Sequence, residues 1–346
     1  MKKVSIIGHF GFGVETFDGQ TIKTKVVANQ IKKWFGEKQV CLHDTHGGIR
    51  FLLMSPFVTF KQLLEAENII IMPGENGLRI IPLLLTFFNV LFSRKLYYVV
   101  IGGWLSTFAQ KHKHIAKQLK KFEAIYVETE RLKKSLEDIG FCNIRIMPNA
   151  KELHILTEDD IQDNGSCAPY RFCIFSRIIE SKGIKDAIDA IEMVNRNNGE
   201  TIALLDIYGH IEEVEWFNEL ESHFPDYIKY CGKVPFSQSV ETIKGYYALL
   251  FPTYYEGECF PGTLIDAMAA GVPVIASDWH DNPSIVINGV TGLVYETRNV
   301  EKLAEFIKKM IDSPKLNREM RLASIKQAEK YLPVNAFDVL KSDLMK

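Results

Sequence analysis

Two carboxylates, Glu258 and Asp266, are separated by seven residues in a stretch whose residue types suit binding of a polar ligand. The apolar run 249–251 before them predicts a buried strand. A helix is predicted to begin near Thr263 and to end at Gly271. Glu258 therefore belongs to the loop after the strand, and Asp266 lies one turn into the helix. In open α/β sheets this edge is where ligands bind.

The stretch offers two kinds of group to one ligand. Carboxylates accept hydrogen bonds from hydroxyls, and the free amides near Gly262 and Thr263 favour an anion such as a phosphate. A sugar nucleotide carries both, because a diphosphate joins its sugar and ribose hydroxyls. The alternative is an ordinary acidic loop before an ordinary helix. The order of strand, acid, helix start, second acid and closing glycine favours a ligand site.

This stretch resembles the signature of the retaining, nucleotide-sugar-dependent glycosyltransferases of family four, which have the GT-B fold. Their pattern is Glu-Gly-Phe-Pro/Gly, four residues, and then Glu-Ala-Met-Ala-x-Gly-x-Pro-Val-Ile. The sequence has Glu-Cys-Phe-Pro from Glu258 and Asp-Ala-Met-Ala-Ala-Gly-Val-Pro-Val-Ile from Asp266. Cys259 replaces a glycine, and Asp266 replaces a glutamate that usually holds the ribose hydroxyls. Aspartate is one methylene shorter but keeps the charge and the hydrogen-bonding capacity.

The resemblance implies a role for each residue of the stretch. Glu258 would contact the donor sugar as a catalytic residue, and Asp266 would contact the ribose. The residues between them that would bind the donor are Phe260, Pro261, Gly262 and Thr263.

A second motif follows the strand predicted at 171–176. The family has Gly-Arg, a short spacer and Lys-Gly, whose cations hold the donor diphosphate. Arg177 and Lys182 match this pattern, and Ser176 replaces the glycine. Two cations just after a strand suit two phosphates, so both are expected to be catalytic residues. The alternative is a pair of surface cations.

Three further donor-binding residues follow from the resemblance. The family uses a glycine-rich loop near the start of its first helix, which implies Gly19 and Gln20; the alternative is a simple turn and cap. The glycines at 8–13 do not have the dinucleotide-binding spacing. The segment 228–234 resembles the strand and loop that meet the nucleotide base, which implies Val234.

The segment from His43 to Gly48 carries two histidines beside an aspartate, at the carboxyl end of a predicted strand, 39–42. These could bind a metal, help to bind the acceptor or transfer a proton, or form a solvated loop. No third ligand follows with zinc-like spacing, and no DxD motif lies in a suitable loop, so no metal is expected.

Strands and helices alternate along the chain in two series. The first series has strands predicted at 4–7, 39–42, 67–72, 95–101, 122–128 and 144–146, and the second begins at 171 after a polar segment, 157–169. Three helical stretches end the chain, at about 299–312, 315–331 and 335–345. With the resemblance, this predicts an α/β GT-B fold, in which two Rossmann-like domains face each other across a cleft. The expected domains are 1–165 for the acceptor, 166–330 for the nucleotide sugar, and a terminal helix, 331–346, that returns to the first domain.

Composition fits a chain of this kind. The 346 residues are 47% hydrophobic, which suffices for two packed cores. A net charge of −2 gives no drive toward nucleic acid, and none is expected as a partner. The six cysteines form no CxxC pair, which is typical of reduced thiols in a cytoplasmic protein. The first apolar run is too short for a signal peptide, and no run is long enough to span a membrane.

An apolar segment, 78–92, predicts a buried or interfacial helix. A helix predicted at 109–121 then carries Lys111, Lys113, Lys117, Lys120 and Lys121. Such a run is usually a solvated face, but beside an apolar helix it could hold an anionic membrane surface. The sequence leaves both interpretations open, and with them a peripheral position at the inner face of the membrane.

Taken together, the motifs predict an enzyme that transfers a sugar with retention from a nucleotide diphosphate sugar, expected to be a UDP-sugar, to an acceptor hydroxyl. The expected acceptor is a glycan or a lipid-linked molecule in surface polysaccharide or glycoconjugate synthesis, and no cofactor is expected. Two alternatives remain: a sugar-nucleotide epimerase, which can share this fold, and a sugar-nucleotide-binding protein without transfer activity.

Overall fold

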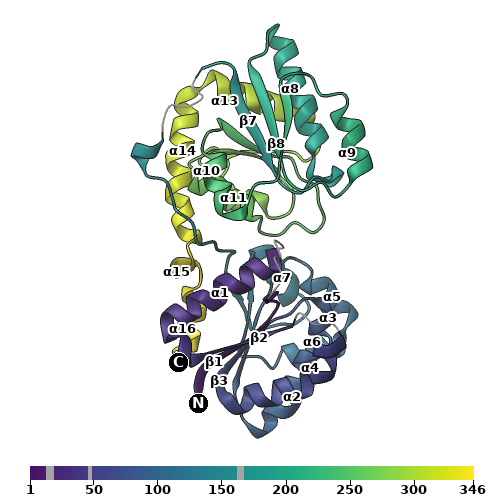
Figure 1. The fold of residues 1–346 in the computed structure, drawn as a ribbon, viewed down its shortest axis with the longest axis vertical. Coiled ribbons are helices and arrows are strands. Elements are labelled where there is room, and N and C mark those ends of the chain that lie inside the picture. Colours follow the sequence, from purple (N-terminus) through teal and green to yellow (C-terminus); the bar gives the residue numbers. More distant parts are fainter. Residues whose placement is uncertain (13–18, 46–48, 162–166) are drawn as a thin grey trace. The chain divides into compact units, whose positions relative to one another are not determined.

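The computed structural model describes residues 1–12, 19–45, 49–161 and 167–346. Part of the His43–Gly48 segment, His46 to Gly48, lies outside the described residues, as do 162–166 of the predicted polar segment. The chain forms two compact units, coloured by sequence in Figure 1. The first contains Met1–Glu152 and Leu332–Lys346, and the second contains Leu153–Tyr331.

The first unit is built on a six-stranded parallel sheet of order β2-β1-β3-β4-β5-β6. The strands are β1 (Lys2–Gly8), β2 (Val40–Asp44), β3 (Ala66–Met72), β4 (Lys95–Val99), β5 (Ala124–Val127) and β6 (Ile144–Ile146). Gly8 at the end of β1 pairs with Asp44 and with Met72, so the carboxyl ends of these three strands meet at one edge. The predicted strand order along the chain is confirmed, with ends shifted by one or two residues.

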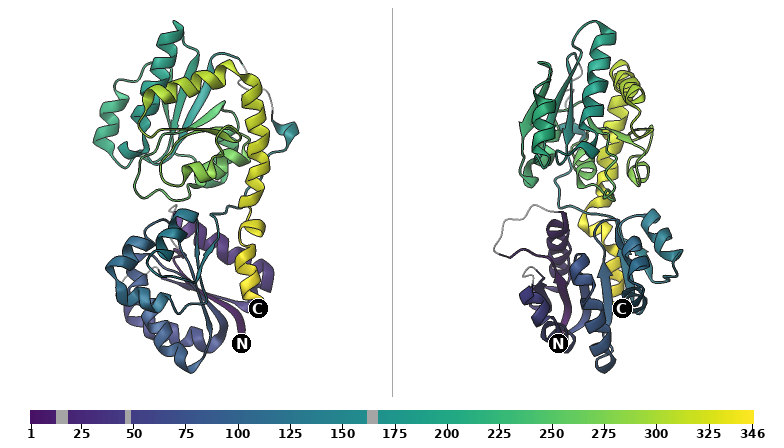
Figure 2. Two further views of the ribbon diagram at one scale, coloured as in Figure 1. Left: turned by 180° about the vertical axis from the view of Figure 1, so that it is seen from behind. Right: turned by 90° about the vertical axis from the view of Figure 1, so that its right-hand side faces the viewer.

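Helices cover both faces of this sheet, which explains the near-continuous apolar run in β3. One face packs against α1 (Gly19–Phe35) and the C-terminal α15 (Pro333–Ala336) and α16 (Asp338–Leu344), as Figure 2 shows from two sides. The other face is covered by α2 (Ile49–Glu65), α3 (Glu75–Leu78), α4 (Ile81–Phe88), α5 (Leu105–Lys111), α6 (Lys113–Leu119) and α7 (Glu130–Glu137). The short turns η1 (Glu37–Gln39) and η2 (Asn89–Leu91) complete the unit.

The second unit has its own six-stranded parallel sheet, of order β12-β11-β10-β7-β8-β9. Its strands are β7 (Tyr170–Phe175), β8 (Ala203–Tyr208), β9 (Ile228–Gly232), β10 (Ala248–Phe251), β11 (Val274–Ser277) and β12 (Gly292–Tyr295). β7 and β10 are neighbours although two strands separate them in the sequence, and Leu249 pairs with both Cys173 and Val274.

Helices also cover both faces of the second sheet. One face packs against α8 (Ile184–Asn198), α9 (Val214–Glu221) and α13 (Val300–Asp312). The other packs against α10 (Ser239–Ile243), α11 (Gly262–Ala269), α12 (Asn282–Ile285) and the end of α14 (Pro314–Ala328). Short turns lie at η3 (Glu158–Asp160), η4 (Glu180–Lys182), η5 (Phe236–Gln238) and η6 (Glu329–Tyr331).

The boundary between the units lies at 152/153 and not at the predicted 165/166. Leu153 and Ile155 pack against the second unit's core, and the Leu156 amide donates to the carbonyl of Ala269 at 3.0 Å. The sequence prediction took the polar composition of 157–169 as the boundary, but the apolar residues before it already belong to the second unit.

The C-terminal segment packs in the first unit through a buried polar contact. On α16, Asp343 pairs with Arg145 of β6, and Tyr126 of β5 donates its hydroxyl to Asp343 Oδ2 at 2.6 Å. Phe337 and Leu340 enter the core beside them. Burial acts to raise the pKa of Asp343, but the hydrogen bonds from Tyr126, Lys346 and Arg145 hold it below the ordinary value.

Three local predictions differ from the structure. The apolar segment 78–92 is broken into α3, α4 and η2, because Pro82 occupies the first turn of α4 and a new helix must begin there. The lysine-bearing segment is two helices, α5 and α6, which meet at His112. The 17-residue α2 was not predicted. Among the described residues, no helix has both the length and the apolar character needed to cross a membrane.

Asp343→Asn should destabilise the protein, because a neutral amide cannot replace the charge that Arg145 and Tyr126 meet. We expect a loss on the order of 1.5–3 kcal/mol at neutral pH, the scale of a hydrogen bond to a charged group. The pKa of Asp343 is depressed in the folded state, so its contribution is present above the unfolded-state value of about 3.9 and is lost as the pH falls through the folded-state value. The difference in thermal stability should therefore shrink in acid. Asp338→Asn, exposed on the same helix, is the matched control; equal losses from both variants would contradict the assignment.

Candidate functional site

The candidate site lies where the order of strands in the second sheet reverses. From β7 the chain proceeds through β8 and β9 on one side, and then returns to β10, β11 and β12 on the other. The strands β7 and β10 are neighbours, and the loops that follow them lead to opposite sides of the sheet. The carboxyl edge at such a point is where open α/β sheets bind ligands. Arg177 and Lys182 lie in the first loop, and Glu258 lies in the second.

Two glycines allow these loops to approach closely. Gly183 has φ +72°, and a Cβ there would stand 2.1 Å from the carbonyl oxygen of Pro252 after β10. Gly209, after β8, has φ +152°, and a Cβ there would stand 1.6 Å from the carbonyl oxygen of Ser176. Any other residue at either position would push the loops apart.

Lys182 and Glu258 form a buried ion pair that joins the two loops. Thr253 lies beside it, with its Oγ1 3.3 Å from Glu258 Oε2. The Lys182 ammonium also lies 5.7 Å from the ring centre of Phe251 and 5.0 Å from that of Tyr255. Since burying a charge is costly unless it is paired, each partner holds the other in a fixed place.

Arg177 stands near this pair but remains half exposed. Its guanidinium lies 5.0 Å from the Tyr255 ring centre, so Tyr255 contacts both cations. Both Glu212 oxygens accept from Arg177 Nη1 at 3.2 Å. An exposed pair of this kind is worth little, so a more highly charged anion can take Arg177 from Glu212.

A chain of hydrogen bonds holds the loop that carries Glu258. The Tyr255 amide donates to Thr253 Oγ1 at 3.2 Å, and Ser277 Oγ donates to the Thr253 carbonyl at 2.6 Å. Asn282 donates to the Ser277 carbonyl at 3.1 Å, and Trp279 Nε1 donates to the Tyr255 carbonyl at 2.8 Å. Sequence reasoning missed Glu212 and these supporting residues. For Tyr255 alone a signal was present, since it directly precedes the acidic turn.

The helix start predicted near Thr263 is confirmed, because α11 begins at Gly262 after Pro261. The Thr263 hydroxyl is buried and finds no hydrogen-bond partner among the described residues. Phe260 packs edge-on against Tyr331 at 5.3 Å between ring centres. Asp266 lies in the first turns of α11 and is only 3% exposed, so the shorter acid keeps its carboxylate close to the helix.

The remaining predicted donor residues lie elsewhere. Val234 follows β9 at the same carboxyl edge as Arg177, two strands away from β7 in the sheet. Gly19 and Gln20 belong to the other unit, where they begin α1, and Gln20 approaches Gly74 after β3. The structure therefore brings Lys182 and Glu258 into contact with each other and places Arg177 next to them through Tyr255.

In the first unit, His43 is tied into the interior. Ser5 Oγ donates to Gln62 Oε1, and Gln62 Nε2 bonds His43 Nε2. Burial and then the positive charge of Lys61 lower the pKa of His43, which favours the neutral imidazole beside this amide. His43 is thus the penultimate residue of a strand and not part of a solvated loop.

A second buried ion pair, between Lys23 and Glu128, was also missed from the sequence. Lys23 lies on α1, and Glu128 directly follows β5. Lys23 Nζ donates to Glu128 and to the carbonyl of Val100 at 3.3 Å. Nothing in the spacing of the two residues, 105 positions apart, could have indicated the pair.

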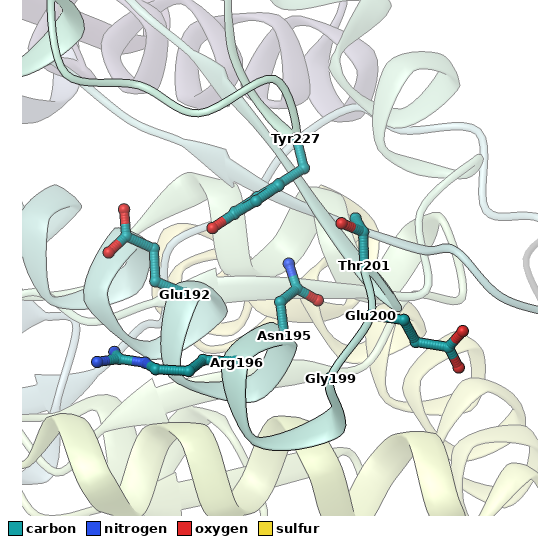
Figure 3. Close-up of a pocket in the computed structure, with 7 residues that line it drawn as sticks. All are labelled: Glu192, Asn195, Arg196, Gly199, Glu200, Thr201 and Tyr227. Atoms are coloured by element: carbon teal, nitrogen blue, oxygen red, sulfur yellow. The ribbon is translucent and has the colours of Figure 1, made fainter.

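A shallow depression of about 550 Å³ lies at the other edge of the second sheet (Figure 3). Glu192, Asn195 and Arg196 reach it from the end of α8, and Tyr227 lies just before β9. Because α8 starts at the carboxyl edge and runs back antiparallel to the strands, its end marks the amino edge. The depression is therefore distant from Lys182 and Glu258, and Asn195 is already occupied with Ala203 and Ile202.

The model of the family described as "Glycosyl transferases group 1" matches residues 158–330, which is half of the chain. The chain belongs to this family. The matched residues include Arg177, the buried pair of Lys182 and Glu258, and α11. The site at the carboxyl edge of the second sheet therefore lies within the part of the chain that matches the family.

Individual relatives agree with this membership. The poly(glycerol-phosphate) alpha-glucosyltransferase of Bacillus subtilis is 24% identical over 236 residues, 64% of this chain and 32% of its own. The N,N'-diacetylbacillosaminyl-diphospho-undecaprenol alpha-1,3-N-acetylgalactosaminyltransferase of Campylobacter jejuni is 24% identical over 220 residues, 63% of this chain and 49% of its own. The matched parts span about a third to a half of the lengths of such curated relatives.

The fold has a similar solved structure over its whole length. HepE of Anabaena in complex with UDP has a TM-score of 0.79 and 15% identity, and the match covers all of both chains. At this identity the likeness bears on the fold alone, and it identifies the fold as GT-B, with two α/β units that each hold a parallel six-stranded sheet. The predicted α/β GT-B fold class is confirmed, and the predicted resemblance is confirmed at the level of the group 1 glycosyltransferases.

Removing one partner of the buried pair should destabilise the protein more than removing both. Lys182→Met or Glu258→Gln leaves the other charge buried without its partner, which typically costs about 3–5 kcal/mol. The double variant removes both charges and should recover most of that loss. Urea unfolding of the four proteins measures the coupling, and additive losses in the double variant would show that the ion pair does not join the loops.

Proposed function

We propose that this group 1 glycosyltransferase moves a sugar, with retention, from a UDP-sugar to an acceptor hydroxyl in the synthesis of surface polysaccharide or glycoconjugate. The single observation that carries the proposal is the grouping of Arg177, Lys182 and Glu258 at the carboxyl edge of the second sheet, beside the start of α11. The solved structures of HepE contain UDP or UDP-glucose, which supports the choice of uracil nucleotide as the first probe.

In this proposal the second unit holds the donor and the first unit holds the acceptor. As the bond between sugar and diphosphate breaks, negative charge grows on the departing diphosphate. Arg177, Lys182 and the free amides of α11 are positioned to stabilise that charge, which raises the rate because the interaction is stronger in the transition state than before it. These groups supply the compensating charge without a metal ion. Because Glu258 already fixes the Lys182 side chain, that side chain loses little conformational freedom when the donor binds.

Glu258 and Asp266 have different roles in the proposal. Glu258 contacts the donor sugar, where charge develops, and its pairing with Lys182 couples the sugar site to the diphosphate site. Asp266 meets the ribose hydroxyls from its position on α11. Gly19, Gln20 and Val234 complete the donor site, and no covalent nucleophile is assigned.

We also propose a cytoplasmic position at the inner face of a membrane, with a glycan or lipid-linked acceptor. Support comes from the free cysteines, which suit a reducing compartment, and from the exposed lysines of α5 and α6. The name of the Campylobacter jejuni relative, with its diphospho-undecaprenol acceptor, makes a lipid-linked acceptor a reasonable first choice.

Arg177 and Glu212 should have opposite effects on UDP affinity. Arg177→Ala should weaken binding by on the order of 1.5–3 kcal/mol, the scale of a charge-assisted hydrogen bond. Glu212→Gln frees Arg177 and should tighten binding, by up to about fivefold because the pair is exposed. Calorimetric titration with UDP, and with GDP and ADP for base preference, measures both. Glu215→Gln, exposed on α9, is the control for a general change in charge, and a tightening of equal size there would remove the assigned role of Glu212.

Loss of Glu258 and loss of Asp266 should be separable by kinetics. Glu258→Gln should lower turnover more than UDP affinity, whereas Asp266→Ala should chiefly weaken UDP binding. Asp266→Glu should be tolerated, since its carboxylate reaches one methylene further from the helix. Release of UDP and of sugar from UDP-sugars, with and without acceptors, gives turnover. Full turnover in Glu258→Gln or unchanged UDP affinity in Asp266→Ala would reject the role assigned to that residue. Conversion of the donor sugar to its epimer, without transfer, would show that the protein is an epimerase.

A further inference from the structure

One aromatic ring, that of Tyr255, contacts both cations of the candidate site. The Arg177 guanidinium and the Lys182 ammonium each lie 5.0 Å from the centre of this ring. Cations are attracted to the face of an aromatic ring at such distances, because the face carries partial negative charge. Two like charges repel each other, so the ring opposes a separation of Arg177 from Lys182.

Arg177 lies between two groups that attract it in different directions. The strand order β10-β7-β8 places the loop of Arg177, after β7, between the loop of Tyr255, after β10, and that of Glu212, after β8. Glu212 accepts from Arg177 at 3.2 Å in an exposed pair. Tyr255 instead belongs to the same turn as Glu258, the partner of Lys182. The Tyr255 ring therefore keeps Arg177 near Lys182, and without the ring Glu212 would hold Arg177 farther away.

The backbone of Tyr255 is fixed by a closed turn. Its carbonyl accepts from the Glu258 amide at 3.0 Å, which closes the turn, and also from Trp279 Nε1 at 2.8 Å. The ring then folds back over Gly257, where a Cβ would stand 2.5 Å from the ring carbon Cε1 of Tyr255. Only a residue without Cβ allows so close an approach, so glycine at this position lets the ring lie where it meets the two cations.

Trp279 and His280 brace this turn from the loop after β11. The Asn282 amide donates to the Trp279 carbonyl at 3.0 Å, which closes a second turn. His280 has φ +49° in it, a left-handed conformation that turns usually give to glycine or asparagine. Its ring centre lies 4.5 Å from that of Trp279, and its Nε2 lies 3.6 Å from Glu256 Oε2. Such strain persists only where surrounding contacts enforce it, and here those contacts join the loop after β11 to the turn of Tyr255.

We propose that Tyr255 sets the spacing of Arg177 and Lys182. The turn of Trp279 and His280 holds Tyr255 in place for this purpose. Tyr255 is then a positioning residue, since it acts through the two cations. The spacing matters for a ligand with two linked phosphates, because both phosphates are met at once only if both cations stand close together. The inference rests on the proposed diphosphate site and adds to it a selectivity for nucleoside diphosphates over monophosphates.

A monophosphate needs less of this arrangement. One phosphate group can be held by the fixed Lys182 and the free amides at the start of α11, wherever Arg177 stands. Selectivity is the difference between two affinities, so displacement of Arg177 should weaken the diphosphate complex and leave the monophosphate complex largely unchanged. The ratio of the two affinities therefore reports the spacing. Because both affinities are measured on the same folded protein, a loss of stability in a variant alters the ratio little.

Calorimetric titration of the full chain with UDP and with UMP tests the inference. The wild type should prefer UDP, and Tyr255→Leu should lower the ratio of the UDP and UMP affinities by about tenfold, because both cations lose their attraction to the ring. The affinity for UMP should change by less than about twofold, so that most of the change comes from UDP. Tyr255→Phe keeps the ring and should keep the wild-type ratio.

Two further variants separate the position of the ring from general effects. Trp279→Phe keeps an aromatic side chain but removes the donor to the Tyr255 carbonyl, so the ratio should fall, by less than in Tyr255→Leu. Tyr254→Leu is the matched control, because this neighbouring ring lies 4.9 Å from a different cation, Arg298. Its loss should leave the ratio as it is in the wild type.

Each outcome either supports or overturns the inference. No preference for UDP in the wild type, a wild-type ratio in Tyr255→Leu, or an equal fall in Tyr254→Leu would overturn it. A fall in Tyr255→Phe as large as in Tyr255→Leu would also overturn it, because the hydroxyl and not the ring would then be responsible. An unchanged ratio in Trp279→Phe would overturn the role of the turn after β11. Failure of the proposed function would appear differently, as a wild-type protein that binds neither UDP nor UMP.

Discussion

The buried contact between Lys182 and Glu258 is the interaction on which the candidate site depends. These two charges have lost most of their water, so neither is stable without the other. Lys182 lies in the loop after β7, and Glu258 lies in the loop after the neighbouring strand β10; from these two strands the chain continues toward opposite edges of the sheet. The ion pair therefore joins the two loops at the point where the order of strands reverses. Gly183 is needed for the same reason, because only a residue without Cβ lets the first loop pass the carbonyl of Pro252. A ligand at this edge would meet charges that are already in place.

The first unit also contains a buried ion pair between a lysine and a glutamate. Lys23 and Glu128 are buried together at the carboxyl edge of its sheet, and Lys23 also reaches the Val100 carbonyl after β4. Each unit thus uses one lysine to join elements that are distant in sequence, at the edge where a parallel sheet exposes the ends of its strands. The C-terminal segment adds a third ion pair in the first unit, between the partly exposed Arg145 and the buried Asp343. In all three, hydrogen bonds to further groups offset part of the cost of burying the charges.

Hydrogen bonds also decide which side of α2 faces the sheet, and they leave Leu53 and Phe57 71% and 74% exposed. The hydrogen bonds of Gln62 to Ser5 and His43 link three elements, and they would be lost if the helix turned. On the side of α2 that faces the sheet, Leu63 joins the apolar core while Ser55, Thr59 and Gln62 are buried beside it.

The sequence by itself determined the class of fold, the family and the identity of the candidate residues. Apolar runs such as 69–72, broken by glycine and proline, specify buried parallel strands because their pattern is local, and the motifs from Glu258 to Ile275 and from Arg177 to Gly183 are contiguous. It did not determine α2, because a helix prediction assumes that an apolar stripe is buried, and here Ser55, Thr59 and Gln62 are buried beside Leu63 while Leu53 and Phe57 are exposed. Only the tertiary structure decided that Lys182 pairs with Glu258, that Tyr255 contacts two cations, that Glu212 occupies Arg177, and that Lys23 meets Glu128. The hydrogen-bonded partners among these residues lie between 35 and 105 positions apart in the sequence. Whether they meet depends on the order of strands in a sheet, which no local sequence pattern specifies.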